Sequence, residues 1–265
     1  MSGYCFTSID LYCLAYLCGK TKIYGLPDPL YNLADEQKSE LIDATINTFL
    51  ERGILIMDFD GNQSLHKELK ELVAVFSDCD ECLTVNISKP DIEDKDLIVW
   101  KKGDAFYLAQ LNNAVYTISV IGENEIRNEF CNFYSELCES ETSVESTVLN
   151  MSLVKASRAA EKGDMQEALR ILKQDGVSDS IASVVVDGMQ KKASYLGCLL
   201  IEISKQNGKT EKYSAFLCSR NKTLHLTQRY CNLRNCTAFG SISKVDAVNE
   251  INCILDAFFS RKEAL

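Results

Sequence analysis

The chain has 265 residues, of which 46% are hydrophobic and 25% charged, with only 3 prolines. These values are ordinary for a soluble globular protein and exclude a disordered or linker-dominated chain. The formal net charge is −10, which argues against nucleic acid or an anionic membrane as a partner, because both attract patches of Lys and Arg.

The first half predicts helices, then strands, then one more helix. Apolar residues recur at helical spacing over 8–18, 35–52 and 64–76, with a short strand at 54–57. Alternating apolar and polar residues predict a strand at 83–88, and strands follow at 97–101, 106–111 and 114–121. A helix over 123–137 closes this half.

The second half repeats that order. Helices are predicted over 144–161, 165–173 and 179–191, strands over 196–205, 213–219, 223–230 and 237–242, and a last helix over 245–259. Two local echoes support a duplication. Residues 83–89 (LTVNISK) match 199–205 (LLIEISK), and the Asn-Glu stretch before Cys131 matches that before Cys253.

This layout predicts an α+β fold built from two duplicated units. Each unit consists of helices and a four-stranded antiparallel meander, and the units are arranged with pseudo-two-fold symmetry around a central antiparallel sheet. The charge differs between the halves. Residues 1–140 contain 24 Asp and Glu against 11 Lys and Arg, whereas residues 141–265 contain 14 against 17. We expect an acidic subdomain over 1–140 and its pseudo-repeat over 141–265, packed as one compact unit.

The N-terminus lacks the basic segment and apolar run of a secretory signal peptide. The longest apolar stretches, such as residues 11–17, are far shorter than the ~20 residues that span a bilayer. We therefore expect a cytoplasmic protein that does not insert into a membrane.

The chain has 12 cysteines, and only Cys79 and Cys82 have C-x-x-C spacing. A zinc site needs a second such pair or nearby histidines, and His66 and His225 are not spaced as ligands. These thiols are interpreted as reduced and structural, with a metal or redox site as the alternative. No metal or cofactor is predicted.

The segment from Asp58 to Asn62, with Asp60 as its second acid, resembles the first motif of haloacid-dehalogenase-type phosphatases. In that motif two aspartates act beside Mg²⁺ as nucleophile and general acid. Asn62 departs from the usual Thr or Val, and no matching downstream motif follows. A tight turn explains the same residues, so the phosphatase remains the alternative function.

A polar segment around Lys89–Asp96 carries a single apolar residue, Ile92, and leads to the only tryptophan, Trp100. Exposed aliphatic and aromatic residues are typical of protein-contact surfaces, although a core position for Trp100 is equally compatible with the pattern. We expect the polar segment to be a loop that binds another protein. The candidate contact residues are Lys89, Ile92, Glu93, Asp94, Asp96, Ile98, Trp100 and Tyr107.

Taken along the chain, the pattern resembles EspG-type chaperones of type VII (ESX) secretion. The similar features are the helix that ends at Leu50-Glu-Arg-Gly53, the turn at 58–62, the leucine-spaced helix after it, and the stretch from Ala168 to Gly176. The chain is richer in Cys and Lys than most members, like relatives found beside LXG toxins in Gram-positive bacteria.

This resemblance implies a cytosolic chaperone without enzymatic activity. Its partner would be a helical secreted protein, either the N-terminal domain of an LXG toxin or a small WXG100-like or PPE-like hairpin. It would bind the tip of that hairpin and keep it soluble and competent for export. A structural subunit of another complex is a further alternative.

Overall fold

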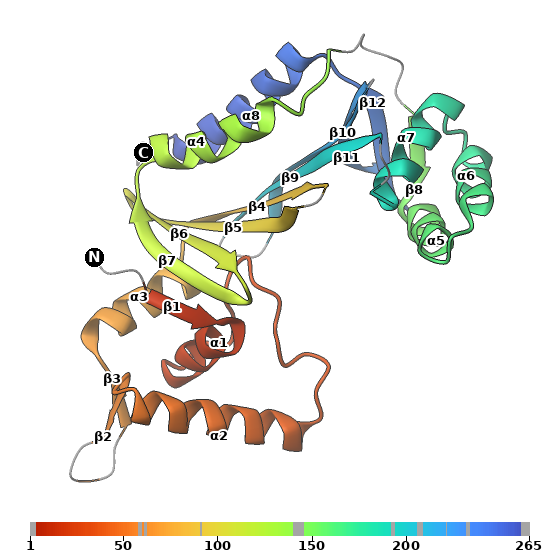
Figure 1. Ribbon diagram of the computed structural model, residues 1–265. Coiled ribbons are helices and arrows are strands. Elements are labelled where there is room, and N and C mark those ends of the chain that lie inside the picture. Colours follow the sequence, from red (N-terminus) through yellow and green to blue (C-terminus); the bar gives the residue numbers. More distant parts are fainter. Residues whose placement is uncertain are drawn as a thin grey trace. The chain divides into compact units, whose positions relative to one another are not determined.

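The structure is a computed structural model, and it describes residues 4–57, 60, 63–90, 92–139, 146–191, 194–205, 209–220, 222–231 and 234–260. The helices (Figure 1) are α1 Ser8–Leu17, α2 Asp35–Glu51, α3 Lys67–Ser77, α4 Glu123–Tyr134, α5 Asn150–Glu161, α6 Met165–Gln174, α7 Asp179–Met189 and α8 Lys244–Phe259. The strands are β1 Tyr4–Thr7, β2 Leu55–Met57, β3 Gln63–Leu65, β4 Glu81–Lys89, β5 Ile92–Lys102, β6 Ala105–Asn112, β7 Val115–Ile121, β8 Ser146–Leu149, β9 Tyr195–Lys205, β10 Thr210–Ser219, β11 Lys222–Cys231 and β12 Arg234–Ser241.

Ten of these strands pair in the order β1-β7-β6-β5-β4-β9-β10-β11-β12-β8, and β2 pairs with β3. The two central strands of this order are β4 and β9. On one side the order continues through β5, β6 and β7 to β1, and on the other side through β10, β11 and β12 to β8. The strand pairs whose register is described are antiparallel, as where Thr237 of β12 faces Val148 of β8. The prediction of an α+β fold with two repeated units and a central antiparallel sheet is confirmed.

The chain divides into two compact units, which share β4 and β5. The first comprises residues 1–84, 97–122 and 204–210, and the second 85–96, 123–203 and 211–265. The boundaries between the units at 84/85 and 96/97 fall inside β4 and β5, so the chain crosses from one unit to the other more than once.

In the first unit, α1 packs against α2 and α3. The acidic side chains of Asp35 and Glu36 lie in the first turn of α2, where they complement the helix dipole. The core joins these helices to the strands, and its large side chains include Phe49, Phe76 and Trp100, all fully buried. Each such side chain contributes about 1.5–3 kcal/mol through removal of apolar surface from water.

The second unit contains two sets of helices. Helices α4 and α8 lie side by side (Figure 1), and the Arg127 guanidinium joins Glu123 on its own helix to Asp256 of α8 over 2.6 Å. Helices α5, α6 and α7 form a small bundle whose buried face packs on Leu217, Leu224 and Phe239 of the strands. None of the helices in the described part of the chain is long and apolar enough to cross a bilayer.

Three local predictions differ from the structure. The helix expected over 64–76 begins at Lys67, after strand β3, and the helix expected over 144–161 begins at Asn150, after strand β8. The polar loop expected around 89–96 is mostly strand, because β5 begins at Ile92. In the first two cases a partner strand takes the segment, since β3 pairs with β2 and β8 with β12, and such pairing overrides local propensity.

Candidate protein-binding surface

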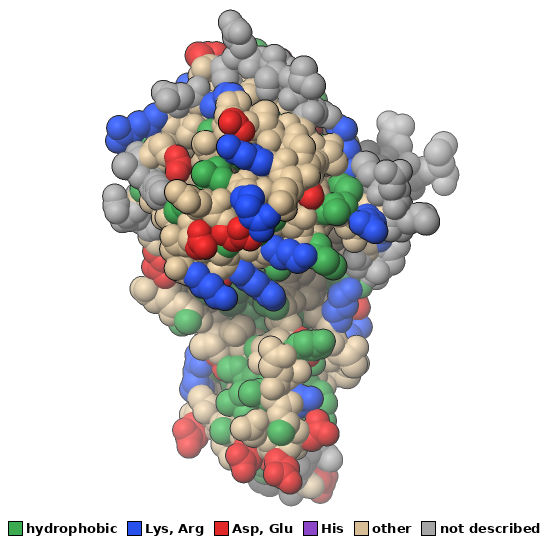
Figure 2. Space-filling model, turned by 90° about the vertical axis from the view of Figure 1, so that its right-hand side faces the viewer, with side chains coloured by type: hydrophobic (Ala, Val, Ile, Leu, Met, Phe, Trp, Pro, Cys, Tyr) green, Lys and Arg blue, Asp and Glu red, His purple; other side chains and the backbone are tan. Residues whose placement is uncertain are grey.

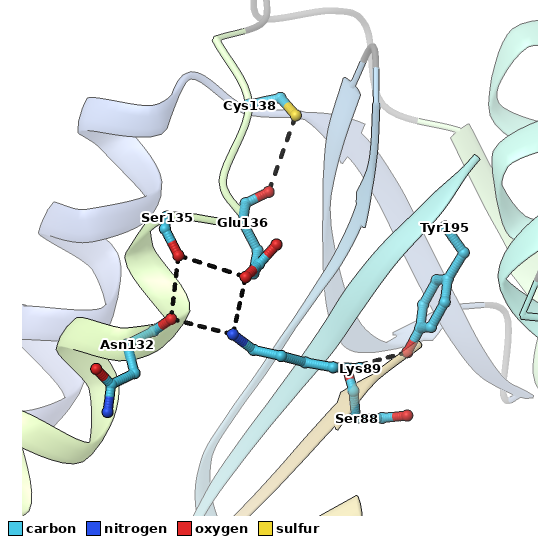
Figure 3. Close-up of polar contacts among 7 residues, drawn as sticks. All are labelled: Ser88, Lys89, Asn132, Ser135, Glu136, Cys138 and Tyr195. Carbon is cyan, nitrogen blue, oxygen red and sulfur yellow. Dashed lines mark hydrogen bonds and ion pairs between the residues drawn. The ribbon is translucent and has the colours of Figure 1, made fainter. Parts of the chain in front are cut away.

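The hairpin of β4 and β5 carries the polar residues that the sequence analysis singled out. The Lys89 ammonium donates to Glu136 over 2.8 Å and to the Asn132 carbonyl oxygen over 3.2 Å. The Ser135 hydroxyl donates to the same two oxygens (Figure 3). This network ties the end of β4 to the C-terminal end of α4.

Further contacts hold the rest of this hairpin. Lys95 pairs with Glu129 of α4, and Asp94 pairs with Lys191, just after α7, over 3.1 Å. The Asn86 amide donates to Asp96 over 2.6 Å, within the hairpin. Of the predicted contact residues here, Glu93 and Asp94 are exposed, whereas Lys89 and Asp96 are engaged inside the fold.

The hairpin backbone is also fixed from strand β9. The Tyr195 hydroxyl donates to the Ser88 carbonyl oxygen over 3.2 Å (Figure 3). Burial raises the pKa of Tyr195 to about 12, so the phenol stays protonated and remains a donor over the physiological pH range. A Cβ on Gly197 would come within 3.0 Å of that same carbonyl oxygen, which leaves little room there for a larger residue.

The remaining predicted contact residues lie in or against the core of the first unit. Trp100 is fully buried, donates its indole N–H to the Tyr24 carbonyl oxygen over 2.8 Å, and packs on Phe76. Ile98 is buried and Tyr107 is half-buried against the same core. The buried side chains of Trp100 and Ile98 support the fold and are covered by it in this conformation, whereas Tyr107 keeps part of its side chain exposed. The side chain of Ile92 lies outside the described part of the structure.

An apolar groove that no sequence pattern predicted lies at the start of α5. It encloses about 780 Å³ and is lined by Leu149, Asn150, Met151, Val154, Arg234 and Asn235. We call these six residues the α5 groove. Its volume lies in the range of functional concave sites, about 300–1,000 Å³.

The junction of β8 and α5 builds this groove. Strand β8 ends at Leu149, where its pairing with Cys236 of β12 also ends. The Asn150 side chain is then held by Gln228 over 3.0 Å and by Thr237 over 2.9 Å. This anchoring fixes the first turn of α5 beside the start of β12.

Two apolar side chains of the groove face solvent, Met151 at 71% exposure and Val154 at 51%. The face of the second unit that carries α5–α7 is turned to the viewer in Figure 2, and hydrophobic side chains there lie beside Lys and Arg. In the sequence, Met151 and Val154 follow helical spacing and resemble core positions. Only the packing of α5 shows that they point outward.

The described residues provide little evidence for a catalytic site. They contain no group of three His, Cys, Asp or Glu side chains that could hold a metal ion. Asp60 is exposed, and Asp58 lies outside the described residues. Ser214 Oγ and His225 Nε2 lie 2.5 Å apart on the paired strands β10 and β11, and Ser214 is almost completely buried.

Comparison with solved structures shows a distant likeness of fold. The chain resembles one in the structure of the Mycobacterium tuberculosis type VII secretion system chaperone EspG5 in complex with the PE25-PPE41 dimer. The fold is a distant EspG-like fold. The TM-score is 0.52, the sequence identity is 9%, and the match covers 96% of each chain.

Sequence comparison does not detect this likeness. No protein-family model matches the chain, and no curated protein matches it. At 9% identity the likeness rests on the order and pairing of helices and strands. Those are the features that hydrophobic periodicity specifies and that tolerate extensive substitution of side chains.

Proposed function

We propose that this protein is a cytoplasmic chaperone of a type VII secretion system. It binds a helical secreted protein and keeps it soluble and competent for export. The observation that carries the proposal is the EspG-like fold over 96% of both chains. Because the likeness covers nearly all of the chain, it is a likeness of the entire fold and not of one motif.

The surface of the chain supports a binding role. Helix α5 presents Met151 and Val154 to solvent beside a groove of about 780 Å³. Exposed apolar side chains that gather at a concave site, with polar residues around them, are typical of surfaces that bind other proteins. We infer that the chain acts by binding and not by catalysis.

We propose the N-terminal domain of an LXG toxin or a WXG100-like hairpin as the partner. The EspG5 structure holds the PE25-PPE41 dimer, and a partner of a similar kind is the simplest for a chain with this fold. At the β4–β5 hairpin, Glu93 and Asp94 remain the proposed contacts, and Lys89 and Asp96 would position them through their internal bonds.

Co-expression tests this function. The chain is expressed together with candidate LXG toxin domains and WXG100-like proteins, and the soluble fraction of each is measured with and without it. We expect one of them to become soluble only in its presence. If every candidate has the same solubility with and without the chain, the chaperone role is wrong.

A further inference from the structure

We propose that the α5 groove binds an acidic amphipathic helix of the partner. The inference rests on the proposed function, because it assigns a surface and a chemistry to the partner proposed there. It follows from three features of the second unit: an exposed apolar strip, unpaired positive charge around it, and a length that suits a helix.

The apolar strip belongs to α5. Met151 and Val154 are three residues apart, so they lie on the same face of the helix, and both are more than half exposed. Leu149 extends the apolar lining at the end of β8. A partner's leucine or methionine side chains would remove this surface from water, which is the main favourable term in protein association.

Three positively charged side chains lie along or beside the strip. Lys155 and Arg158 continue the exposed face of α5, and Arg234 lines the groove from β12. None of the ion pairs among the described residues involves these three. By contrast, Arg127, Arg170 and Lys191 each pair with an acid of this chain.

An acid next to the groove is already engaged. The Asp175 carboxylate accepts the Leu149 backbone N–H over 3.2 Å. The three cations are therefore available to carboxylates of another molecule, and a partner with Glu or Asp beside its apolar residues complements them. Complementary charge of this kind raises association rates and selects among partners.

The outward face of α5 suits a helix more than an extended peptide. Met151, Val154, Lys155 and Arg158 follow the i, i+3, i+4, i+7 pattern, which forms a straight strip about 10 Å long at ~1.5 Å per residue. Two turns of a second helix packed alongside would cover that strip at an interaxial distance of about 8–10 Å.

The test uses two labelled synthetic helices of about 20 residues, a length at which isolated helices become stable in water. Both carry the same leucine face, and the polar face is Glu-rich in one and Lys-rich in the other. Fluorescence anisotropy measures their binding to the full chain. We expect the Glu-rich helix to bind at least ~10-fold more tightly, and its affinity to fall with added salt.

Four variants locate the site. Val154→Asp and Arg158→Glu should each weaken the Glu-rich helix by about 10-fold or more, as central contacts do. Val245→Asp changes another exposed helical valine of the second unit (63% exposed) and should leave binding unchanged. Arg220→Glu changes an exposed arginine directly after β10 and should also have no effect. Circular dichroism checks that each variant is folded.

The outcomes separate this inference from the function on which it rests. Equal binding of the two helices, or equal effects of the groove variants and their controls, overturns the groove assignment. If a co-expressed secretion partner binds the wild type and Val154→Asp equally well, the chaperone role stands and the groove assignment is wrong. If no secretion partner binds but the Glu-rich helix does so at the groove, the function is wrong and the groove assignment stands.

Discussion

Trp100 donates its indole N–H to the Tyr24 carbonyl oxygen over 2.8 Å at a site that solvent does not reach. Replacing it with Phe keeps most of the apolar volume but leaves that buried oxygen without its donor. We expect Trp100→Phe to lower the free energy of unfolding by about 1–3 kcal/mol.

Urea denaturation followed by circular dichroism measures this change. Tyr16→Phe is the matched control, because Tyr16 is an aromatic residue of the same unit that is 57% exposed, and its effect should stay within about 0.5 kcal/mol. Equal effects of the two substitutions would contradict the core position of Trp100.

The cysteines differ in their access to solvent. Cys5, Cys131 and Cys253 are exposed, whereas Cys13 and Cys79 are fully buried. Burial raises the pKa of Cys13 to about 11 and that of Cys79 to about 12. A thiol whose pKa is raised by two units has about 100-fold less of the reactive thiolate at pH 8 than an ordinary thiol has.

Labelling of the native protein with a maleimide, read by mass spectrometry at each site, tests this division. The three exposed thiols should react first, and Cys13 and Cys79 should react only after unfolding. Because the thiolate forms as pH rises through the pKa, raising the pH to 9 should not expose the buried pair to reaction. Early labelling of Cys79 would contradict its burial.

At the scale of elements, the link between α1 and α2 depends on a glycine. Gly25 has φ +79°, and a Cβ there would lie 2.8 Å from the Cys82 sulfur and 2.9 Å from Ile98 Cγ2. We expect Gly25→Ala to destabilise the protein by about 2 kcal/mol or more, through the left-handed backbone and overpacking of the core.

Gly53 allows the cost of the left-handed backbone to be measured apart from the cost of overpacking. It also has positive φ, at +65°, but no atom lies within 4 Å of the position of its Cβ. Gly53→Ala should therefore cost only about 1 kcal/mol. Thermal unfolding of both variants gives the comparison, and equal losses would show that packing around Gly25 is looser than described.

The helices and the meanders could be predicted from hydrophobic periodicity, but β8 could not. Its residues, Ser146–Leu149, run without a break into the helical pattern of α5, and its partner β12 is almost 90 residues away. That missed strand also hid the α5 groove, because its junction with the helix turns Met151 and Val154 outward. Burial of Trp100 beside a polar segment likewise depends on contacts remote in sequence.

For the whole molecule, the order of the ten-stranded sheet repeats about its centre, as the echo between residues 83–89 and 199–205 predicted. This layout agrees with the EspG-like fold. Residues 85–96 of the β4–β5 hairpin and the α5 groove both lie in the second unit, and we propose that a helical partner engages that unit.

The most direct measurement is the mass of the species formed when the chain is co-expressed with each proposed partner, an LXG toxin domain or a WXG100-like protein. Size-exclusion chromatography with light scattering gives that mass in solution. The account predicts a stable species whose mass is the sum of the chain, 29.7 kDa, and its partner in a whole-number ratio. Separate elution of the chain and every candidate partner would contradict it.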